Sequence, residues 1–423
     1  MTPELSDRFP RYTGFDPSVP VRCVTPGEGR VIHRFFDTSP FSPSGRCIAL
    51  CRLPYEDRSP VPGDAAEVVV VDLETAEERV VAKTRGWEMQ TGAHVQWGHS
   101  DSELCFNDMR PGEWRPFGVC LDPTSGARRE LDGTVYMVSP DGSKAASPCL
   151  LRTARTQAGY GVAVPPEQLP ANRGAPDDDG VYVTDLESGG RRLLVSLRQV
   201  VEEALDSAER EKCAGGDFYA FHVKWDPGGD RLMLVLRWMP PDGGARVSSL
   251  VTLKADGSDL RMAIPASEWA GKGGHHPNWC PDGEHVMINL SIHGGGRSRL
   301  RFVQARYDGS DYREMIADVP GSGHPTMHPD GRHVLTDVYA HGPLACGDGT
   351  TPIRWVDLAS GEDRQLIRIR TQPPEGRGGE LRVDPHPAWD YSYRRFAFNA
   401  CPDGTRRVYV AEMGELLDGG VSS

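Results

Sequence analysis

The feature that most constrains this chain is a short phrase that recurs along its whole length. An aromatic or apolar residue is followed by one variable residue, then by Pro-Asp-Gly or a variant of it, and then by an apolar run. Pro, Asp and Gly in this order favour a tight turn, so each copy predicts the end of one strand and the start of the next. The phrase is clear at Trp279 and decayed at Trp97 and Trp389. Seven anchors align, at Phe41, Trp97, Val138, Trp225, Trp279, Met327 and Trp389.

A second hairpin signal follows the anchors, as in Val70–Thr75 and Val356–Gly361. Two hairpins in each repeat build a four-stranded blade. The sequence therefore predicts an all-β fold, a single seven-bladed β-propeller domain over residues 1–423. Few residues follow Val408–Ala411, so we expect the N-terminal segment, which includes Arg30–Phe36, to complete the last blade and remove a free sheet edge.

The long interval between Val138 and Trp225 predicts an inserted loop-helix segment at about residues 150–215. Residues 164–180 are rich in Pro, Gly and Asp, which is typical of a loop. From Leu193 to Cys213 apolar residues recur at helical spacing, which predicts one helix. We expect this segment to lie over one face of the propeller.

Composition excludes several classes of function. The formal net charge is -13 and no run of Lys and Arg exists, which argues against nucleic-acid binding. No apolar run is long enough for a membrane-spanning helix. The first ten residues do not resemble a secretory signal, and the ten cysteines include no CxxC pair. We therefore expect a cytoplasmic protein with reduced thiols.

Five of the seven anchors have a histidine three residues upstream: His94, His222, His276, His324 and His386. With 13 histidines in 423 residues, chance does not explain this register. In a propeller these positions are expected at one mouth of the central channel, where imidazoles can bind a metal ion or transfer protons. The alternative is an inherited histidine that only stabilises its own blade. His275 is expected to point away from His276, because side chains alternate along a strand.

Three phrases resemble those of the oligogalacturonate lyases, which are seven-bladed propellers that cleave uronic-acid oligosaccharides by β-elimination. The phrases are His276–Gly283, Gly323–Gly331 and Asp384–Trp389. The specific likeness is confined to the C-terminal part of the chain, whereas the TolB-like repeat extends over most of it. The resemblance implies that His276 is the catalytic base and that Arg246 is an active-site arginine.

The same resemblance implies a divalent metal ion, such as Mn, Zn or Ca, bound by His324 and His386. At two further positions of the metal site the family has a histidine and a glutamine. This chain has Asp384 in place of the histidine and Leu381 in place of the glutamine. Asp384 can bind a cation through oxygen, whereas Leu381 cannot. His222 is a substitute ligand by register, or a substrate-binding residue.

The related ulvan-type propeller lyases use a histidine of an early blade with a tyrosine beyond it. His94 and Tyr160 fit that pattern, and Tyr160 opens the inserted segment. Arg173 and Arg382 are further candidates for binding an anionic substrate. The expected partner is a small anionic oligosaccharide, because an inserted cap from about Gly159 to Cys213 would narrow the mouth.

β-Elimination requires a neutralised carboxylate, a base for the C5 proton and a proton for the leaving oxygen. Arg246 with a metal ion, a neutral imidazole, and Tyr160 or water match these requirements. Two alternatives stay open: a non-catalytic propeller that serves as a binding or docking module, and another metal-dependent enzyme on the same fold. A propeller peptidase is disfavoured, because no room is left for a separate catalytic domain.

Overall fold

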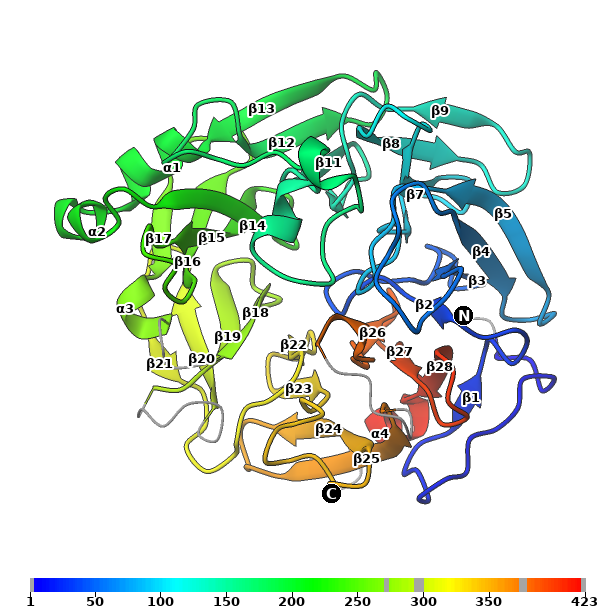
Figure 1. Ribbon diagram of the computed structural model, residues 1–423. Helices are drawn as coiled ribbons and strands as arrows, with labels where there is room; N and C mark the ends of the chain where they lie inside the picture. Colours follow the sequence, from blue (N-terminus) through cyan, green and yellow to red (C-terminus); the bar gives the residue numbers. More distant parts are fainter. Residues whose placement is uncertain (1–3, 270–273, 293–299, 373–378, 420–423) are drawn as a thin grey trace. The chain divides into compact units, whose positions relative to one another are not determined.

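The computed structural model describes residues 4–269, 274–292, 300–372 and 379–419. These residues form seven antiparallel sheets of four strands each (Figure 1). The fold is a seven-bladed β-propeller, which confirms the predicted fold class. Six sheets are built from four consecutive strands, and the seventh combines the last three strands with the first.

The strands of each sheet follow in the order of their hydrogen bonding. They are β2 (Val31–Ile32), β3 (Cys47–Arg52), β4 (Ala66–Asp72) and β5 (Glu78–Thr84); β6 (Gln96–Trp97), β7 (Leu104–Met109), β8 (Pro116–Leu121) and β9 (Arg128–Glu130); β10 (Met137–Val138), β11 (Lys144–Ser147), β12 (Gly180–Asp185) and β13 (Arg191–Ser196); β14 (Asp217–Trp225), β15 (Arg231–Met239), β16 (Val247–Lys254) and β17 (Arg261–Ile264); β18 (Gly274–Trp279), β19 (His285–Leu290), β20 (Arg301–Arg306) and β21 (Arg313–Glu314); β22 (Thr326–Met327), β23 (His333–Thr336), β24 (Thr350–Asp357) and β25 (Asp363–Arg370); and β26 (Ala388–Trp389), β27 (Arg395–Ala400), β28 (Arg407–Glu412) and β1 (Val21–Cys23).

The chain divides into two compact units. Unit 1 comprises residues 1–108, 121–128 and 322–423, and unit 2 comprises residues 109–120 and 129–321. The two units are described separately below. The expectation of a single domain over residues 1–423 stays a prediction.

The anchor turns form as predicted. β18 ends at Trp279 and β19 begins at His285. Between them, the Asp282 carboxylate accepts hydrogen bonds from the backbone N–H groups of Glu284 (2.9 Å) and His285 (3.0 Å). Gly283 has a φ of 68°, a conformation that glycine adopts at little cost. Pro-Asp-Gly is therefore selected by the geometry of the turn.

The first anchor is an exception. The innermost strand of the first sheet is β2, and Phe41 makes only an isolated bridge with Ile48. Arg30–Phe36 thus belongs to the first sheet, which corrects its expected place in the last one. The N-terminal strand in the last sheet is β1, where Val21 pairs with Ala411 of β28.

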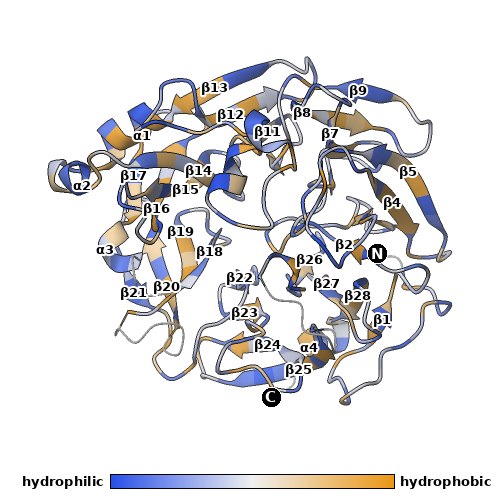
Figure 2. Ribbon diagram, in the orientation of Figure 1, coloured by the Kyte–Doolittle hydropathy of each residue, from blue (hydrophilic) through white to orange (hydrophobic). Residues whose placement is uncertain are grey.

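Sheet-to-sheet packing within each unit buries the apolar strand residues. In unit 2, Phe221 and Trp279 pack with Val286 and Ile288 of β19. Outer strands such as β9 and β25 carry more hydrophilic residues (Figure 2). Each large apolar side chain removed from water stabilises the fold by roughly 1.5–3 kcal/mol. The anchor aromatics also tie neighbouring sheets together, since Trp279 Nε1 donates to the Lys224 carbonyl at 3.3 Å.

The expected insertion consists of two separate pieces. The first is the loop between β11 and β12, with short 3₁₀ turns at Arg152–Arg155 and Pro166–Gln168. The second is a pair of helices, α1 (Leu197–Ala204) and α2 (Ser207–Lys212), between β13 and β14. Prediction of one helix from Leu193 was wrong, because Leu193–Ser196 pairs with β12.

The two pieces of the insertion pack differently. Leu197 and Val200 of α1 pack with Leu194 of β13 and Leu260, which precedes β17, so the helix covers outer strands of unit 2. The loop instead brings Tyr160 against Phe221 of the innermost strand β14. Two further short helices are α3 (Ala266–Trp269) and α4 (Gly414–Gly419). Among the described residues, no helix has the length and apolar character needed to cross a membrane.

Candidate functional site

Most of the register histidines share an unusual backbone conformation. His94, His222, His276 and His386 have φ values of 54°, 49°, 65° and 50°. Positive φ is uncommon outside glycine, although histidine is among the residues enriched there. The strand register shifts at two of these positions, between Phe221 and Lys224 and between His275 and Asn278. Such bulges re-aim side chains, and strained backbone often accompanies functional sites.

Unit 1 brings together the three predicted metal ligands, His324, Asp384 and His386. One potential ligand atom from each lies within 4.8 Å of the other two. The ring centroids of His324 and His386 are 4.2 Å apart. Both imidazoles are buried, against Phe35 in particular.

A buried carboxylate, Asp337, connects the two histidines. Its Oδ1 accepts from the His324 backbone N–H at 2.6 Å, and its Oδ2 accepts from the His386 backbone N–H at 3.2 Å. The His324 Nδ1 atom lies 3.0 and 2.9 Å from the two carboxylate oxygens. Donation from Nδ1 leaves Nε2 of His324 as the nitrogen with a lone pair for a cation.

Arginines position the third ligand. Arg382 Nε donates to Asp384 Oδ2 at 2.7 Å. Burial raises the pKa of Asp384, but Arg382 and other nearby cations outweigh it, and the pKa lies below its ordinary value. Arg406 is buried and donates to the carbonyls of Leu381 and Arg382. Arg382, predicted as a substrate-binding residue, thus contacts the carboxylate of Asp384.

The residues present fit a divalent cation. Both ring nitrogens of His386 are buried and make no hydrogen bond within the described part of the chain. Burial lowers the pKa of His386 well below its ordinary value, and the charge of His324 lowers it further. A neutral imidazole with a lone pair is a metal ligand, and two imidazoles with one carboxylate suit Zn or Mn. Leu381 contributes its backbone carbonyl, which accepts a hydrogen bond from Arg406.

His94 lies in a different environment of unit 1. Its Nε2 atom is 3.7 Å from Glu88 Oε2 and 3.4 Å from Thr91 Oγ1, and all three side chains are buried. A buried carboxylate beside an imidazole can orient it or share its proton. The structure therefore places this candidate base with an acidic partner.

Unit 2 brings together the other two register histidines with their neighbour His275. The ring centroids of His222 and His275 are 5.5 Å apart, and those of His275 and His276 are 4.9 Å apart. The expectation that His275 points away from His276 was wrong. The positive φ of His276 and the adjacent register shift break the alternation of side chains.

A fully buried arginine, Arg237, lies against this group. It donates to Thr156 Oγ1 (2.9 Å), Gln157 Oε1 (2.6 Å) and His275 Nε2 (3.1 Å), and its guanidinium stacks 3.3 Å from the Phe221 ring centroid. The insertion loop thus covers Arg237 through residues 156 and 157.

Arg246 adds a second positive charge. Its Nη1 donates to the Thr156 carbonyl, and burial lowers its pKa. Burial and then the charge of Arg246 also lower the pKa of Arg237, well below its ordinary value. Neither arginine forms an ion pair with any described residue, and the undescribed segments of this unit, 270–273 and 293–299, contain no Asp or Glu.

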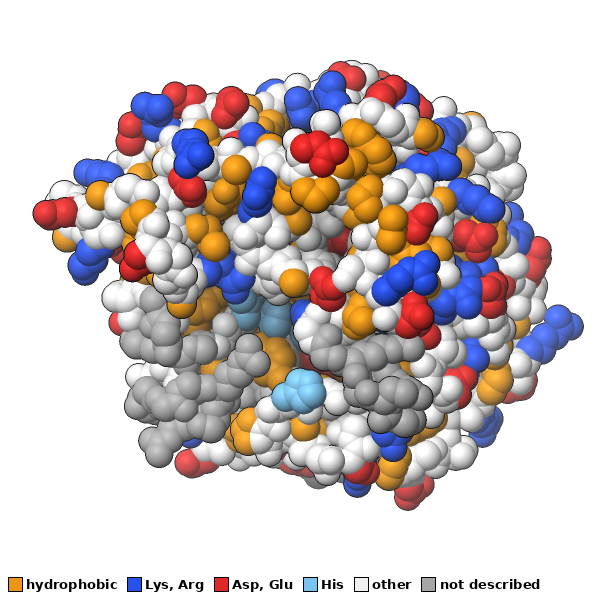
Figure 3. Space-filling model, in the orientation of Figure 1, with side chains coloured by type: hydrophobic (Ala, Val, Ile, Leu, Met, Phe, Trp, Pro, Cys, Tyr) orange, Lys and Arg blue, Asp and Glu red, His pale blue; other side chains and the backbone are white. Residues whose placement is uncertain are grey.

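Guanidinium groups keep their proton in proteins, and a buried charge without a counter-ion is costly. Unit 2 therefore contains buried positive charge that an anionic ligand would compensate. Histidine side chains are visible beside Lys or Arg side chains in Figure 3, over the region where β14 and β18 lie in Figure 1.

Comparison with solved structures decides the fold class. A structure described as oligogalacturonate lyase in complex with manganese matches over 96% of both chains, with a TM-score of 0.64 and 14% sequence identity. An oligogalacturonate lyase from Vibrio parahaemolyticus gives the same values. This chain has a lyase-like propeller fold. The tricorn protease also matches, over 92% of this chain and 34% of its own, with a TM-score of 0.53 and 11% identity.

Neither a protein-family model nor a curated protein matches the sequence. The likeness is therefore one of fold, and the chemistry depends on the residues of this chain. The manganese belongs to the matching lyase structure.

Two tyrosines line the histidine group of unit 2. The predicted catalytic Tyr160 is buried, and its ring centroid lies 5.9 Å from that of His222. The hydroxyl of Tyr136 is hydrogen-bonded to His222 Nδ1. Phenol groups thus occur beside the imidazoles, as a proton donor to a leaving oxygen requires.

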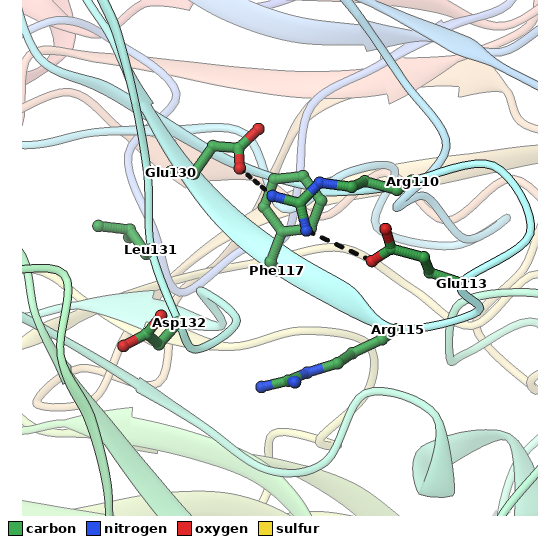
Figure 4. A pocket seen from close by; sticks show the side chains of 7 residues that line it. All are labelled: Arg110, Glu113, Arg115, Phe117, Glu130, Leu131 and Asp132. Carbon is green, nitrogen blue, oxygen red and sulfur yellow. Dashed lines mark hydrogen bonds and ion pairs between the residues drawn. The ribbon is translucent and has the colours of Figure 1, made fainter.

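Two further features of unit 2 are the predicted substrate-binding residue Arg173 and a surface pocket. Arg173 is exposed, whereas the adjacent Asn172 is buried and bonded to Asp179 at 2.8 Å. The pocket is built around Arg110, which is paired with Glu113 and Glu130 and stacks over Phe117 (Figure 4). The charge of Arg110 is already neutralised by these two carboxylates, and the pocket lining includes none of the predicted site residues.

Sequence reasoning missed Asp337 and Arg237. A signal for Asp337 exists: the position 13 residues after a register histidine is Asn107, Asn289, Asp337 or Asn399 in four of the five cases. The side chain at this position contacts the segment before its own inner strand, as Asn399 does by donating from Nδ2 to the Asp384 carbonyl at 3.4 Å. Arg237 carries no comparable signal, because it follows a run of apolar residues in β15.

Proposed function

We propose that this protein is a carbohydrate-active lyase that cleaves uronic-acid oligosaccharides by metal-assisted β-elimination. The observation that carries the proposal is the buried Arg237 with the half-buried Arg246, neither of which has a carboxylate partner among the described residues. Arg237 donates to His275, whose ring lies beside those of His222 and His276. A uronide supplies the missing carboxylate and a weakly acidic C5 proton next to it. Neutralising that carboxylate stabilises the negative charge that develops when the proton leaves.

In the proposed reaction, Arg246 binds the carboxylate and Arg237 adds positive charge behind it. His276 accepts the C5 proton as a neutral imidazole. The C–H electrons form the C4–C5 double bond, and the C4–O bond breaks. The leaving oxygen takes a proton from Tyr160 or from water.

His324, His386 and Asp384 are the proposed ligands of a divalent ion, and Mn or Zn suits this donor set better than Ca. When bound, such an ion supplies positive charge that polarises and neutralises a carboxylate. The chain's own contribution is to keep His386 neutral, through burial, and to hold Asp384 ionised, through Arg382. A cytoplasmic location and a short oligosaccharide substrate complete the proposal.

The test is an ultraviolet assay for the conjugated double bond that elimination leaves. We expect wild-type protein with Mn²⁺ to produce this chromophore from oligogalacturonate or another uronic-acid oligosaccharide, and a chelator to abolish it. His276→Ala should lower kcat by about 10²–10⁴-fold, because a positioned general base contributes that much. The matched control His285→Ala removes a histidine at the start of β19 and should retain the rate.

Variants also separate the two families of propeller lyase. If His276→Ala retains full activity while His94→Ala and Tyr160→Phe are inactive, the base is His94 and the ulvan-like alternative is correct. His275→Ala is the third variant in this comparison, since His275 Nε2 accepts a hydrogen bond from Arg237. If no uronide yields the chromophore with any divalent ion, the lyase proposal is wrong, and a non-catalytic binding module becomes the better account.

A further inference from the structure

We infer that Asp337 is the positioning residue that makes His324 and His386 a cation site. The inference deepens the proposed function and depends on it only for the use of the bound ion. Asp337 directly follows β23, the strand that pairs with β22, and it is fully buried. Nothing in the likeness to known lyases assigns a role to this position.

The first support is geometric. One carboxylate accepts from the backbone N–H groups of both histidines and from the ring of His324. It thereby holds the His324 ring with Nε2 toward a shared ion and fixes the spacing between two separate blades of unit 1. Ligand imidazoles commonly donate their other nitrogen to such a carboxylate, and loss of that partner weakens metal binding by about 10–100-fold.

The second support is the comparison between blades. The equivalent position carries asparagine in three other blades, at Asn107, Asn289 and Asn399. Asn107 bonds the segment that precedes its own inner strand, where its backbone N–H donates to Ala93 O at 2.9 Å and its Nδ2 donates to the same oxygen at 3.4 Å. An amide is sufficient there. Of these four positions, only the one whose side chain accepts from the backbone N–H groups of two register histidines, Asp337, carries a carboxylate.

The third support is charge. The only ion pair of Asp337 with a described residue is with His324, at 2.9 Å, and both side chains are 1% exposed. Asp384 adds a second carboxylate, which Arg382 already pairs. A buried carboxylate without a permanent cation is costly. A divalent ion on His324 compensates Asp337 through the imidazole.

A close contact shows that the position of the carboxylate is tightly set. A Cβ atom added to Gly323 would lie 2.1 Å from Asp337 Oδ1 and 2.2 Å from the Asp337 backbone oxygen, and Gly323 has a φ of 64°. Gly323→Ala therefore displaces Asp337, both its carboxylate and its backbone, without removing its charge. It is a second, independent perturbation of the same contact.

The test is calorimetric titration of Mn²⁺ into the chelator-stripped full-length protein. We expect Asp337→Asn to raise the Kd for Mn²⁺ by about 10–100-fold, since the amide nitrogen cannot accept from either histidine and the charge is lost. Gly323→Ala should raise it in the same direction. The control Asn107→Ala removes the matching side chain of another blade and should leave the Kd unchanged. Circular dichroism checks that each variant is folded.

The inference is overturned if folded Asp337→Asn binds Mn²⁺ within about twofold of wild type. It is also overturned if the wild type binds no Mn²⁺ or Zn²⁺, even when a uronide is cleaved. If Asp337→Asn does not fold, the Gly323→Ala titration decides in the same way. Weakened Mn²⁺ binding in a protein that cleaves no uronide supports the inference and removes the lyase proposal, so the two failures are distinguishable.

Discussion

At the scale of single residues, the proposed chemistry depends on arginines that have no carboxylate partner among the described residues. Arg246→Lys is expected to lower kcat/KM for a uronide by about 10–100-fold, because hydrogen bonds to charged groups contribute about 1.5–3 kcal/mol. A lysine keeps the charge but cannot bind a carboxylate through two parallel N–H groups. Steady-state kinetics measure the loss.

The control for that change is Arg198→Lys on α1, an exposed arginine paired with Asp177 at 2.7 Å. It should retain wild-type kinetics. Equal kinetics for Arg246→Lys and wild type would show that Arg246 does not bind the substrate carboxylate.

The sequence was informative wherever a residue type recurs in register. The anchors placed five histidines at equivalent positions, and the three predicted ligands His324, Asp384 and His386 do meet. The role of Arg237 could not be predicted, because the residues that cover it, Thr156 and Gln157, lie 81 and 80 positions earlier in the chain. Nor could the proximity of His275 and His276, because periodicity does not reveal a positive φ.

At the scale of elements, turn chemistry was more reliable than helix periodicity. The two helices do carry start signals: the Ser196 side chain accepts from the Gln199 backbone N–H, and Asp206 with Glu209 forms a capping box. These capping signals mark the residues at which the two helices begin. The spacing of the apolar residues instead predicted a helix that extended wrongly into β13. The missing strand at Phe41 arises because the first sheet begins earlier, at β2.

The anchor turns predict a pH-dependent contribution to stability. Asp330 Oδ1 accepts from the backbone N–H groups of Arg332 (2.9 Å) and His333 (3.0 Å). Burial opposes ionisation, but the bond with His333 and these N–H groups outweigh it and lower the pKa of Asp330 to about 2. Asp330→Ala should lower the free energy of unfolding by about 1 kcal/mol at pH 7.

The pKa in the folded state lies below that in the unfolded state, which is about 4. The stabilisation is therefore complete above pH 4 and lost as the pH falls toward 2. Urea unfolding between pH 7 and pH 3 should show the difference between wild type and Asp330→Ala shrinking below about pH 4. A difference that is constant over this range would contradict the role of the ionised carboxylate.

At the scale of the whole molecule, the propeller fold brings distant segments of the chain together in each cluster of histidines. In unit 1, His324 and His386 come from the sixth and seventh sheets. In unit 2, the insertion loop between β11 and β12 of the third sheet covers Arg237 of the fourth, which contacts His275 of the fifth. The net charge of -13 disfavours anionic ligands at long range, so the proposed binding of a uronide requires local cations.

The central claim is that the protein breaks a uronide linkage by elimination, without adding water. The most direct measurement is mass spectrometry of products formed from a uronic-acid oligosaccharide in water enriched in heavy oxygen, with Mn²⁺ present. Elimination predicts an unsaturated product, lighter by one water than the hydrolysis product, with no solvent oxygen incorporated in either fragment during cleavage. Products that carry one solvent oxygen for each broken linkage would contradict the claim and identify a hydrolase.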